Sequence, residues 1–322
     1  MKISAPSLAV ALIFFAQLIS GCLIDSGNNS QTDDVSNDLL EDPPLYDCID
    51  FQGLERCWHI HAPEGINKTT CGIISCPLVM DIHGFTDDVS RQMNVSGFDE
   101  LANEFGFILV YPIGYETSWN AGWCCGEARD NSLDDVGLLL DIIDIVEENW
   151  STDPNRVYVT GWSNGCAMTQ KLVNSASHRI TAAGCMAMYF IDDPSPEYQA
   201  VPIMEVHGVR DLFVHYGVGY GSSILFDGSL EGDEGAIQNM EYWAELNGCS
   251  GLTPDVEIIE WDYSVLGYTN CEHGSEVRLV SLNFAGHNPY LKDSPDQDIF
   301  PGNPTGIDTS RMVWEFVSQF SK

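Results

Sequence analysis

The segment 156–177 constrains the fold of this chain more than any other part of the sequence. It begins with a short β-rich apolar run, 156–160, continues through Gly161-Trp162-Ser163-Asn164-Gly165, and ends in a helix-like stretch, 166–177. The glycines permit a sharp turn that a Cβ atom would obstruct. A strand, Gly-x-Ser-x-Gly and a helix in this order lift the serine onto the top edge of a sheet. The sequence therefore predicts that Ser163 stands at a strand-to-helix turn, where a serine can act as a nucleophile.

The pentapeptide alone leaves an alternative open. At average glycine and serine frequencies, roughly one chain in ten of this length contains the pattern by chance. A glycine-rich turn whose serine caps the following helix would look the same. The decision between the two interpretations therefore depends on the rest of the chain.

Strand-like and helix-like segments alternate along the sequence. Apolar runs predict strands over 57–61, 77–82, 107–111, 182–190, 201–206 and 277–284. Helical periodicity predicts helices over 96–105, 134–150, 234–246 and 308–320. We expect Ser132 to cap the second helix, and we expect 57–61 to be an antiparallel edge strand. The alternation predicts an α/β fold with a mostly parallel sheet, helices on both faces and the site at the carboxyl ends of the strands.

Two later strand ends supply the partners that a nucleophilic serine needs. A serine hydroxyl requires a histidine base, and the histidine requires a carboxylate that orients it. The strand 201–206 leads into Asp211, and the strand 277–284 leads into His287, which is the order serine, acid, histidine. Asp192 and Asp193 follow another strand and are alternative acids that we expect in a solvated loop.

Three other histidines are alternatives to His287 as the base, but we expect each to have another role or location. His207 and His215 flank Asp211 in the wrong chain order, and we expect His207 to bond a loop carbonyl. His273 lies in a glycine-bearing turn and is expected to be exposed.

An anionic tetrahedral intermediate needs two backbone N–H donors. We expect one from Asn164, which follows the serine at the start of a helix. The loop after the strand 77–82 reads His83-Gly84-Phe85, and we expect Phe85 N–H to be the second donor, because Gly84 allows close approach of the backbone. A simple tight turn at His83-Gly84 is the alternative.

The first residues have the pattern of an export signal. Lys2 precedes an apolar run, 8–19, that is too short to span a bilayer comfortably. Ile19-Ser20-Gly21-Cys22 is similar to the lipobox of bacterial lipoproteins. We expect a signal peptide over 1–21, a lipidated Cys22, an acidic disordered tether over 22–45 and a catalytic domain over 46–322. Cleavage that leaves Cys22 free or disulfide-bonded is the alternative. The predicted location is extracellular or periplasmic, with anchoring to the cell envelope.

Acidic residues greatly outnumber basic ones. The formal net charge is −35, from 48 acidic and 13 basic residues among 322. Such a surface repels phosphate backbones and anionic membranes, so we expect no nucleic-acid partner and no membrane contact besides a lipid anchor. Solubility is the interpretation that we prefer for this charge, and an acidic face that recruits a cationic partner is the alternative.

The cysteine count indicates an oxidising compartment. Setting Cys22 aside leaves ten of the 11 cysteines, an even number. We expect pairs Cys48–Cys57 and Cys249–Cys271, and Cys71 and Cys76 bracket a short loop. The adjacent Cys124 and Cys125 are expected to bond elsewhere. No Cys-x-x-Cys pair is present, so we expect no metal site.

Several short motifs together resemble the secreted polyhydroxybutyrate depolymerase and feruloyl esterase family of α/β hydrolases. The resemblance extends from about Leu54 to Phe320. The matching residues are Ile82-His83-Gly84, Ser118-Trp119-Asn120-Ala121-Gly122, Cys124-Cys125-Gly126, Asp134-Asp135-Val136, Val159 to Gly165, His207-Gly208, Asp211, Val214, Tyr216, Trp243, Asn247-Gly248-Cys249 and Gly286-His287.

The resemblance implies an α/β-hydrolase fold, hydrolysis of carboxylic esters, and neither a metal nor an organic cofactor. It also implies that Ser163, Asp211 and His287 form the catalytic triad. The implied substrates are hydroxyalkanoate polyesters and their oligomers, or feruloyl and acetyl esters of plant polysaccharide. Two other functions are weighed: a non-catalytic surface lipoprotein that binds through the same fold, and a peptidase.

Three aromatic residues are expected to contact the substrate. The resemblance places Trp119 at the site as a substrate-facing ring. Trp162 beside the serine and Tyr290 after the histidine are expected to do the same. The family follows its histidine with Trp-Pro, whereas this chain has Asn288-Pro289-Tyr290, a departure that bears on substrate preference.

Overall fold

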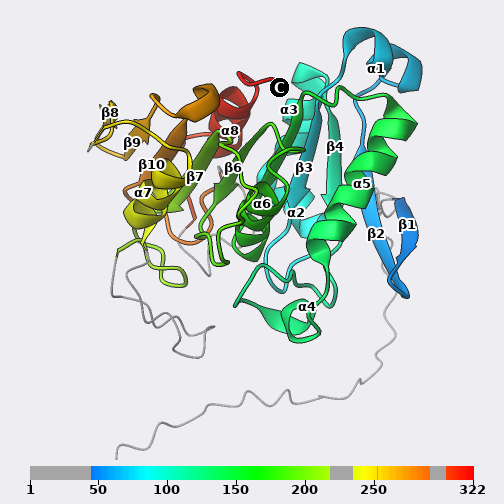
Figure 1. The fold of residues 1–322 in the computed structure, drawn as a ribbon, viewed down its shortest axis with the longest axis horizontal. Coiled ribbons are helices and arrows are strands. Elements are labelled where there is room, and N and C mark those ends of the chain that lie inside the picture. Colours follow the sequence, from blue (N-terminus) through cyan, green and yellow to red (C-terminus); the bar gives the residue numbers. More distant parts are fainter. Residues whose placement is uncertain (1–44, 218–234, 252, 291–301) are drawn as a thin grey trace, which may run out of the picture. The chain divides into compact units, whose positions relative to one another are not determined.

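The computed structural model describes residues 45–217, 235–251, 253–290 and 302–322 (Figure 1). The expected signal peptide, Cys22 and all of the expected tether except Leu45 lie outside the described residues. All described residues belong to one compact unit, Pro43–Lys322. Within the described ranges, no helix has the length and apolar character needed to cross a membrane.

A ten-stranded sheet forms the centre of this unit. Its strand order is β1-β2-β4-β3-β5-β6-β7-β10-β9-β8. The six strands from β4 to β10 in this order pair in parallel, and two antiparallel strands flank them on each side. The strands are β1 (Tyr46–Phe51), β2 (Leu54–His61), β3 (Leu78–Ile82), β4 (Ile108–Pro112), β5 (Val157–Gly161), β6 (Ala182–Met186), β7 (Ile203–Gly208), β8 (Val256–Ile259), β9 (Tyr263–Tyr268) and β10 (Val277–Leu282).

Helices cover both faces of the sheet. The helices are α1 (Lys68–Ile74), α2 (Val89–Ser96), α3 (Phe98–Phe105), α4 (Gly126–Asp130), α5 (Asp135–Trp150), α6 (Asn164–Ser175), α7 (Ala236–Leu246) and α8 (Thr309–Val317), with a 3₁₀ turn at Glu272–Gly274. In Figure 1, α5, α6 and α7 lie in front of the sheet, and α2, α3 and α8 lie behind it. Each group of helices packs in its own hydrophobic core. The predicted α/β class with helices on both faces is confirmed.

The pleat of the strands explains the two cores. In β3, Met80 contributes to the core beneath α5 and α6, whereas its neighbour Val79 contributes to the core beneath α3 and α8. Successive side chains of a strand point to opposite faces, so a strand covered on both sides is apolar throughout. This explains why β3, β4, β5, β6 and β7 are buried along their whole length.

Several element boundaries differ from the sequence expectations. The segment 57–61 lies in β2, which is not an edge strand because β1 pairs with its outer side. Gly97 adopts a left-handed conformation, φ 67°, so the helix expected over 96–105 begins at Phe98 as α3, and Ser96 is the last residue of α2, a helix that was not predicted. Asp134, not Ser132, caps α5, because its side chain accepts from Gly137 N–H. The strand expected over 182–190 ends at Met186, beyond which Ala187 has φ 61°.

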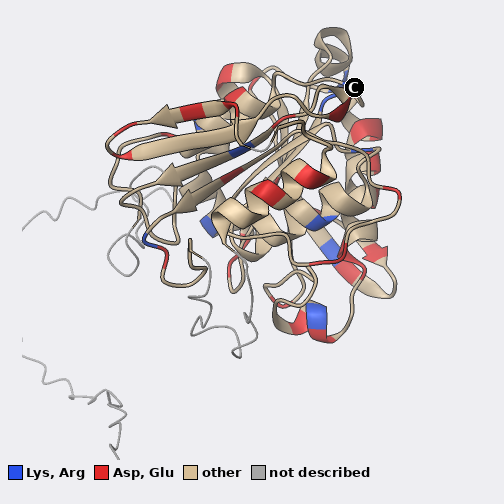
Figure 2. Ribbon diagram, turned by 60° about the vertical axis from the view of Figure 1, so that its left-hand side comes forward, with Lys and Arg blue, Asp and Glu red and all other residues tan. Residues whose placement is uncertain are grey.

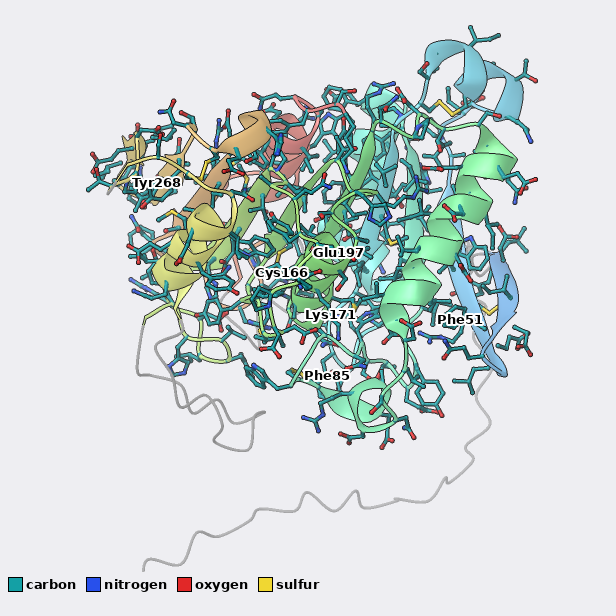
Figure 3. The ribbon with its side chains drawn as sticks, in the orientation of Figure 1. Phe51, Phe85, Cys166, Lys171, Glu197 and Tyr268 are labelled. Carbon is teal, nitrogen blue, oxygen red and sulfur yellow. A yellow bond between two sulfur atoms is a disulfide. The ribbon has the colours of Figure 1, made fainter. Side chains whose placement is uncertain are left out.

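Five disulfides join the ten described cysteines, and Figure 3 shows the sulfur atoms in yellow. The expected pairs Cys48–Cys57 and Cys249–Cys271 are confirmed. Cys71 bonds to Cys76, and Cys166 on α6 bonds to Cys185 on β6. The expectation for Cys124 and Cys125 is wrong, since they bond to each other. The other eight described cysteines are paired among themselves, so no described thiol is left for Cys124 or Cys125.

Acidic residues, red in Figure 2, are spread over the helices and loops in view, with basic residues, in blue, scattered among them. One group of three possible metal ligands occurs in the described ranges, formed by Cys48, Glu55 and Cys57. Cys48 and Cys57 are joined in a disulfide, so neither offers the thiolate that binds a metal.

Candidate active site

The turn between β5 and α6 holds Ser163 in a conformation that few residues adopt. Ser163 has φ 54° and ψ −120°, and its side chain is half-buried. A Cβ atom on Gly161 would lie 2.7 Å from both Gly165 O and Ile82 O, and a Cβ atom on Gly165 would collide with Ile82 O. The two glycines are therefore required by the close approach of the β3 end to the turn. Strained backbone of this kind is held only where the surrounding structure determines it.

The ends of three strands bring Ser163, His287 and Asp211 together. Ser163 Oγ lies 2.9 Å from His287 Nε2, and His287 Nδ1 lies 2.7 Å from Asp211 Oδ2. Ser163 follows β5, Asp211 follows β7 and His287 follows β10, so all three lie at the carboxyl edge of the sheet. This arrangement can accept a proton from the serine hydroxyl and stabilise the resulting imidazolium.

Asp211 is held from several directions. Its Oδ1 atom accepts hydrogen bonds from Phe213 N–H at 2.7 Å and Val214 N–H at 2.9 Å. Burial opposes ionisation of this carboxyl, but the neighbouring His287 and His207 hold the pKa of Asp211 well below its usual range. Asp211 is therefore an ionised carboxylate at neutral pH.

Contacts with the neighbouring loops fix the position of His287. Gly208 at the end of β7 lies against the backbone carbonyls of Ala285 and Gly286, where no Cβ atom could fit. The carbonyl of His287 accepts a hydrogen bond from Trp162 Nε1 at 2.7 Å. The residue beside the serine thus holds the backbone that carries the histidine.

The expected oxyanion donors occupy the loop after β3 and the start of α6. Gly84 lies against the turn, because a Cβ atom placed on it would be 3.5 Å from Ser163 Cβ. Phe85 lies near the start of α4 (Figure 3), where its ring contacts the Gly126 position. Asn164 is the first residue of α6, where helix N–H groups attract anions. Among the described residues, neither Phe85 N–H nor Asn164 N–H has a hydrogen-bond acceptor.

A buried histidine shapes the loop that carries Phe85, and sequence reasoning missed this role. Burial lowers the pKa of His83 to about 4, so its ring is neutral at neutral pH. His83 Nδ1 lies 2.8 Å from Gly84 O, and Nε2 lies 2.9 Å from Gly114 N. A neutral ring therefore donates through Nδ1 and accepts through Nε2, which ties the loop to the segment after β4.

The expectation that Trp119 and Tyr290 face the substrate is wrong. Trp119 is 0% exposed, and its Nε1 donates to His83 O at 3.0 Å. Its backbone N–H donates to Asn164 Oδ1 at 2.8 Å. Trp119 is therefore hydrogen-bonded to both segments that carry the expected oxyanion donors, the loop after β3 and the start of α6. Tyr290 is 1% exposed, and its hydroxyl accepts from Gln92 Nε2.

Trp162 is also buried, with 6% of its surface exposed. Its ring centroid lies 5.6 Å from that of His287 and 6.0 Å from that of Tyr290. Its Nε1 donates to His287 O, so the polar edge of the ring faces the protein, and contact of its exposed part with the substrate stays a prediction. In all three aromatics the polar atom has a partner inside the protein.

The residues considered as alternatives to Asp211 and His287 are either exposed or bonded to other partners. Asp192 pairs with Lys171 at 3.0 Å, and Asp193 and His273 are exposed. His207 Nε2 lies 2.8 Å from Val214 O, which confirms the expected bond to a loop carbonyl. Its other nitrogen lies 2.7 Å from Glu205 Oε1, a contact that sequence reasoning missed. A lone carboxylate inside the apolar run 201–206 is the signal that could have indicated it.

Comparison with known proteins finds relatives that are named esterases. No protein-family model matches it. It is 23% identical over 84% of its length to a bifunctional acetylxylan esterase/xylanase of Neocallimastix patriciarum, covering 34% of that protein. It is 26% identical over 77% of its length to feruloyl esterase B of Piromyces equi, covering 42% of it. The chain therefore spans less than half the length of these two relatives.

Two further comparisons complete this result. A poly(3-hydroxyalkanoate) depolymerase C of Paucimonas lemoignei is 30% identical over 34% of this chain and 25% of its own length. The structure of an acetyl xylan esterase from Aspergillus awamori superposes with a TM-score of 0.56 at 15% identity, over 80% of this chain and 99% of that one. The chain is thus an α/β hydrolase by fold and a homologue of proteins named acetylxylan esterase, feruloyl esterase and polyhydroxyalkanoate depolymerase, as its motifs predicted.

Proposed function

We propose that this protein is a serine carboxylesterase whose triad is Ser163, His287 and Asp211. The observation that carries the proposal is the continuous chain of contacts from Ser163 Oγ through both nitrogens of His287 to Asp211. Esterase homologues support the same conclusion. A binding module that kept only the fold would have no need of this alignment or of the strained Ser163 backbone.

The reaction proceeds through an acyl-enzyme. Ser163 Oγ attacks the ester carbonyl carbon while its proton passes to His287 Nε2. Asp211 holds the ring in the tautomer that accepts at Nε2 and stabilises the imidazolium. The carbon–oxygen bond to the alcohol then breaks, and the alcohol leaves with the proton from His287. Water attacks the acyl-enzyme with His287 again as base, which releases the acid and restores Ser163.

Two backbone donors stabilise the negative charge of each tetrahedral intermediate. Phe85 N–H and Asn164 N–H are the proposed donors, and both lack an acceptor within the described ranges. Removing one donor of such a pair lowers the rate by about 10²–10³ in well-studied enzymes. The buried partners of these loops, Trp119 and His83, keep the donors in place before substrate arrives.

The proposed substrates are feruloyl or acetyl esters carried by polysaccharide. Relatives with these names cover 84% and 77% of this chain, whereas the depolymerase match covers 34% of it. Polyhydroxyalkanoate oligomers are the second candidate, supported by the higher 30% identity within that shorter match.

The experiment is a comparison of substrates and variants of the purified chain. Wild type is assayed on short p-nitrophenyl esters, methyl ferulate, acetylated xylan and hydroxybutyrate oligomers. We expect hydrolysis by wild type and by Ser318→Ala, an exposed serine at the end of α8, and none by Ser163→Ala. Absence of wild-type activity on every ester contradicts the proposal, and hydrolysis of the oligomers alone contradicts the preferred substrate class.

We further propose export and anchoring through residues 1–21 and Cys22, with 22–45 as a tether to the domain 46–322. The lipobox-like Ile19-Ser20-Gly21-Cys22 and the five disulfides support this location. In a bacterial host, wild type is expected in the detergent phase, and Cys22→Ala in the aqueous phase. Equal partitioning of the two proteins contradicts lipidation of Cys22.

A further inference from the structure

A buried histidine lies directly behind the triad. His207 is 0% exposed and belongs to β7, one residue before its end. Its Nε2 atom lies 2.8 Å from Val214 O and 3.5 Å from Asp211 Oδ2. Its Nδ1 atom lies 2.7 Å from Glu205 Oε1. His207 thus connects a second buried carboxylate to the carboxylate that orients His287.

The surroundings of His207 fix a proton on Nε2 and favour a second proton on Nδ1. A backbone carbonyl only accepts hydrogen bonds, so Nε2 must donate to Val214 O. Burial raises the pKa of Glu205, but the bond and charge of His207 and the bond from Asn239 Nδ2 of α7 to Oε2, at 2.5 Å, oppose that rise and favour a carboxylate whose Oε1 accepts from Nδ1. A histidine that donates from both nitrogens is an imidazolium.

The other groups that face this ring are also identified. Tyr189 stacks on it with ring centroids 5.3 Å apart, and Tyr216 meets it edge-on at 5.8 Å. The Tyr216 hydroxyl is itself bonded to Ser281 Oγ of β10. Within the described ranges, the titratable side chains that these contacts place around the ring are Glu205, Asp211 and the two tyrosines.

We propose that His207 is a positioning residue of the triad, a buried imidazolium that Glu205 holds in place and that sets how strongly the charge of Asp211 acts on His287. Asp211 Oδ2 faces His287 Nδ1 at 2.7 Å on one side and His207 Nε2 at 3.5 Å on the other. The positive ring fixes the carboxylate and partly offsets its charge. This inference rests on the triad of the proposed function.

Electrostatics agree with the geometry. Burial opposes a charged ring, but the hydrogen bonds and charges of Asp211 and Glu205 raise the pKa of His207 to about 10. His207 is therefore charged throughout the range in which an esterase of this kind is assayed.

Removing the charge of His207 has a defined kinetic consequence. His287 must be neutral to accept the Ser163 proton, so kcat/KM falls at low pH, where the ring is protonated; this fall is the acidic limb of the pH–rate profile. His207→Gln keeps an N–H donor for Val214 O but leaves Asp211 and Glu205 uncompensated. We expect the midpoint of the acidic limb to move to higher pH by about one unit. Glu205→Gln/His207→Gln removes both charges, and we expect less than half of that shift.

The test combines pH–rate profiles with a measurement that needs no activity. His273→Gln, at an exposed histidine, is the matched control and is expected to keep the wild-type profile. In wild type at pH 8, ¹⁵N NMR is expected to show both ring nitrogens of His207 protonated. A neutral His207 at pH 8 overturns the proposal, as does an unshifted acidic limb in folded His207→Gln.

The two proposals fail separately. Full activity in Ser163→Ala refutes the proposed function. An inactive Ser163→Ala together with a neutral His207 in wild type refutes only this inference. Because the NMR result is obtained from wild type, the inference remains testable even where the variants do not fold.

Discussion

Ser163 Oγ and His287 Nε2 lie 2.9 Å apart although 124 positions separate the two residues in the chain. The sheet produces this proximity, because β5 and β10 end at the same edge with β6 and β7 between them. Trp162 adds a direct link, since its Nε1 bonds the carbonyl of His287. The turn that carries Ser163, the proposed nucleophile, is therefore also bonded to the loop that carries His287, the proposed base.

Replacing Trp119 by Phe tests whether this residue supports the oxyanion segments rather than the substrate. The variant loses the hydrogen bond from Nε1 to His83 O, and we expect about 1–3 kcal/mol less stability. We expect kcat to fall while KM stays unchanged, because the ring is buried. Trp261→Phe, at a tryptophan that is 76% exposed, is the control. A raised KM with unchanged kcat in Trp119→Phe contradicts this role.

Gly165 in the turn and Gly84 in the loop packed against it should respond differently to alanine. In Gly165→Ala the new Cβ collides with Ile82 O, so we expect a loss of about 3 kcal/mol or more in unfolding free energy. In Gly84→Ala the new Cβ lies 3.3 Å from Trp162 O and 3.5 Å from Ser163 Cβ. We expect this variant to fold but to lose about 10-fold or more in kcat/KM, since the tight contact with Trp162 O shifts the turn that carries Ser163. Equal stability losses in the two variants would argue against the predicted packing of the turn.

The pH dependence of stability should contain a contribution from Asp81. Burial, opposed by hydrogen bonds from Ser96 and Gln92, raises the pKa of this carboxyl to about 7. Below about pH 4 Asp81 is protonated in both the folded and the unfolded chain, and its full contribution to stability is present. Between about pH 4 and 7 the unfolded chain releases the proton while the folded chain keeps it, so stability falls by up to about 4 kcal/mol.

Denaturant unfolding of Asp81→Asn checks this expectation. The amide does not titrate, so the decline between about pH 4 and 7 should be smaller by the Asp81 contribution. Asp141→Asn, at an exposed position on α5, should keep the wild-type slope. An identical slope in wild type and Asp81→Asn is the contrary result.

The sequence predicted the parts of this molecule that depend on position along the chain. Ser163, Asp211 and His287 each follow a strand, and parallel strands end at one edge, so their convergence could be expected before the structure was known. The long helix α5 was predicted because its apolar stripe repeats with the helical period.

The parts that depend on side-chain direction could not be predicted in the same way. Trp119 lies in a motif expected at the active site, and Tyr290 follows His287 closely in the chain. Only packing determines that their rings point inward. Glu205 is explained only by partners from the same strand and from α7. The bond between Cys124 and Cys125 depends on which other thiols are already paired. In each case the deciding contact joins segments distant in sequence or depends on the rest of the fold.

The nucleophilic role of Ser163 is tested most directly by labelling with a p-nitrophenyl phosphonate and mapping the modified residue by mass spectrometry. Wild type is predicted to release one equivalent of p-nitrophenol per chain and to carry the phosphonyl group on Ser163. Ser163→Ala is predicted to release none, while Ser318→Ala reacts like wild type. No labelling of wild type, or a phosphonyl group on another residue, would contradict the assignment of Ser163 as the nucleophile.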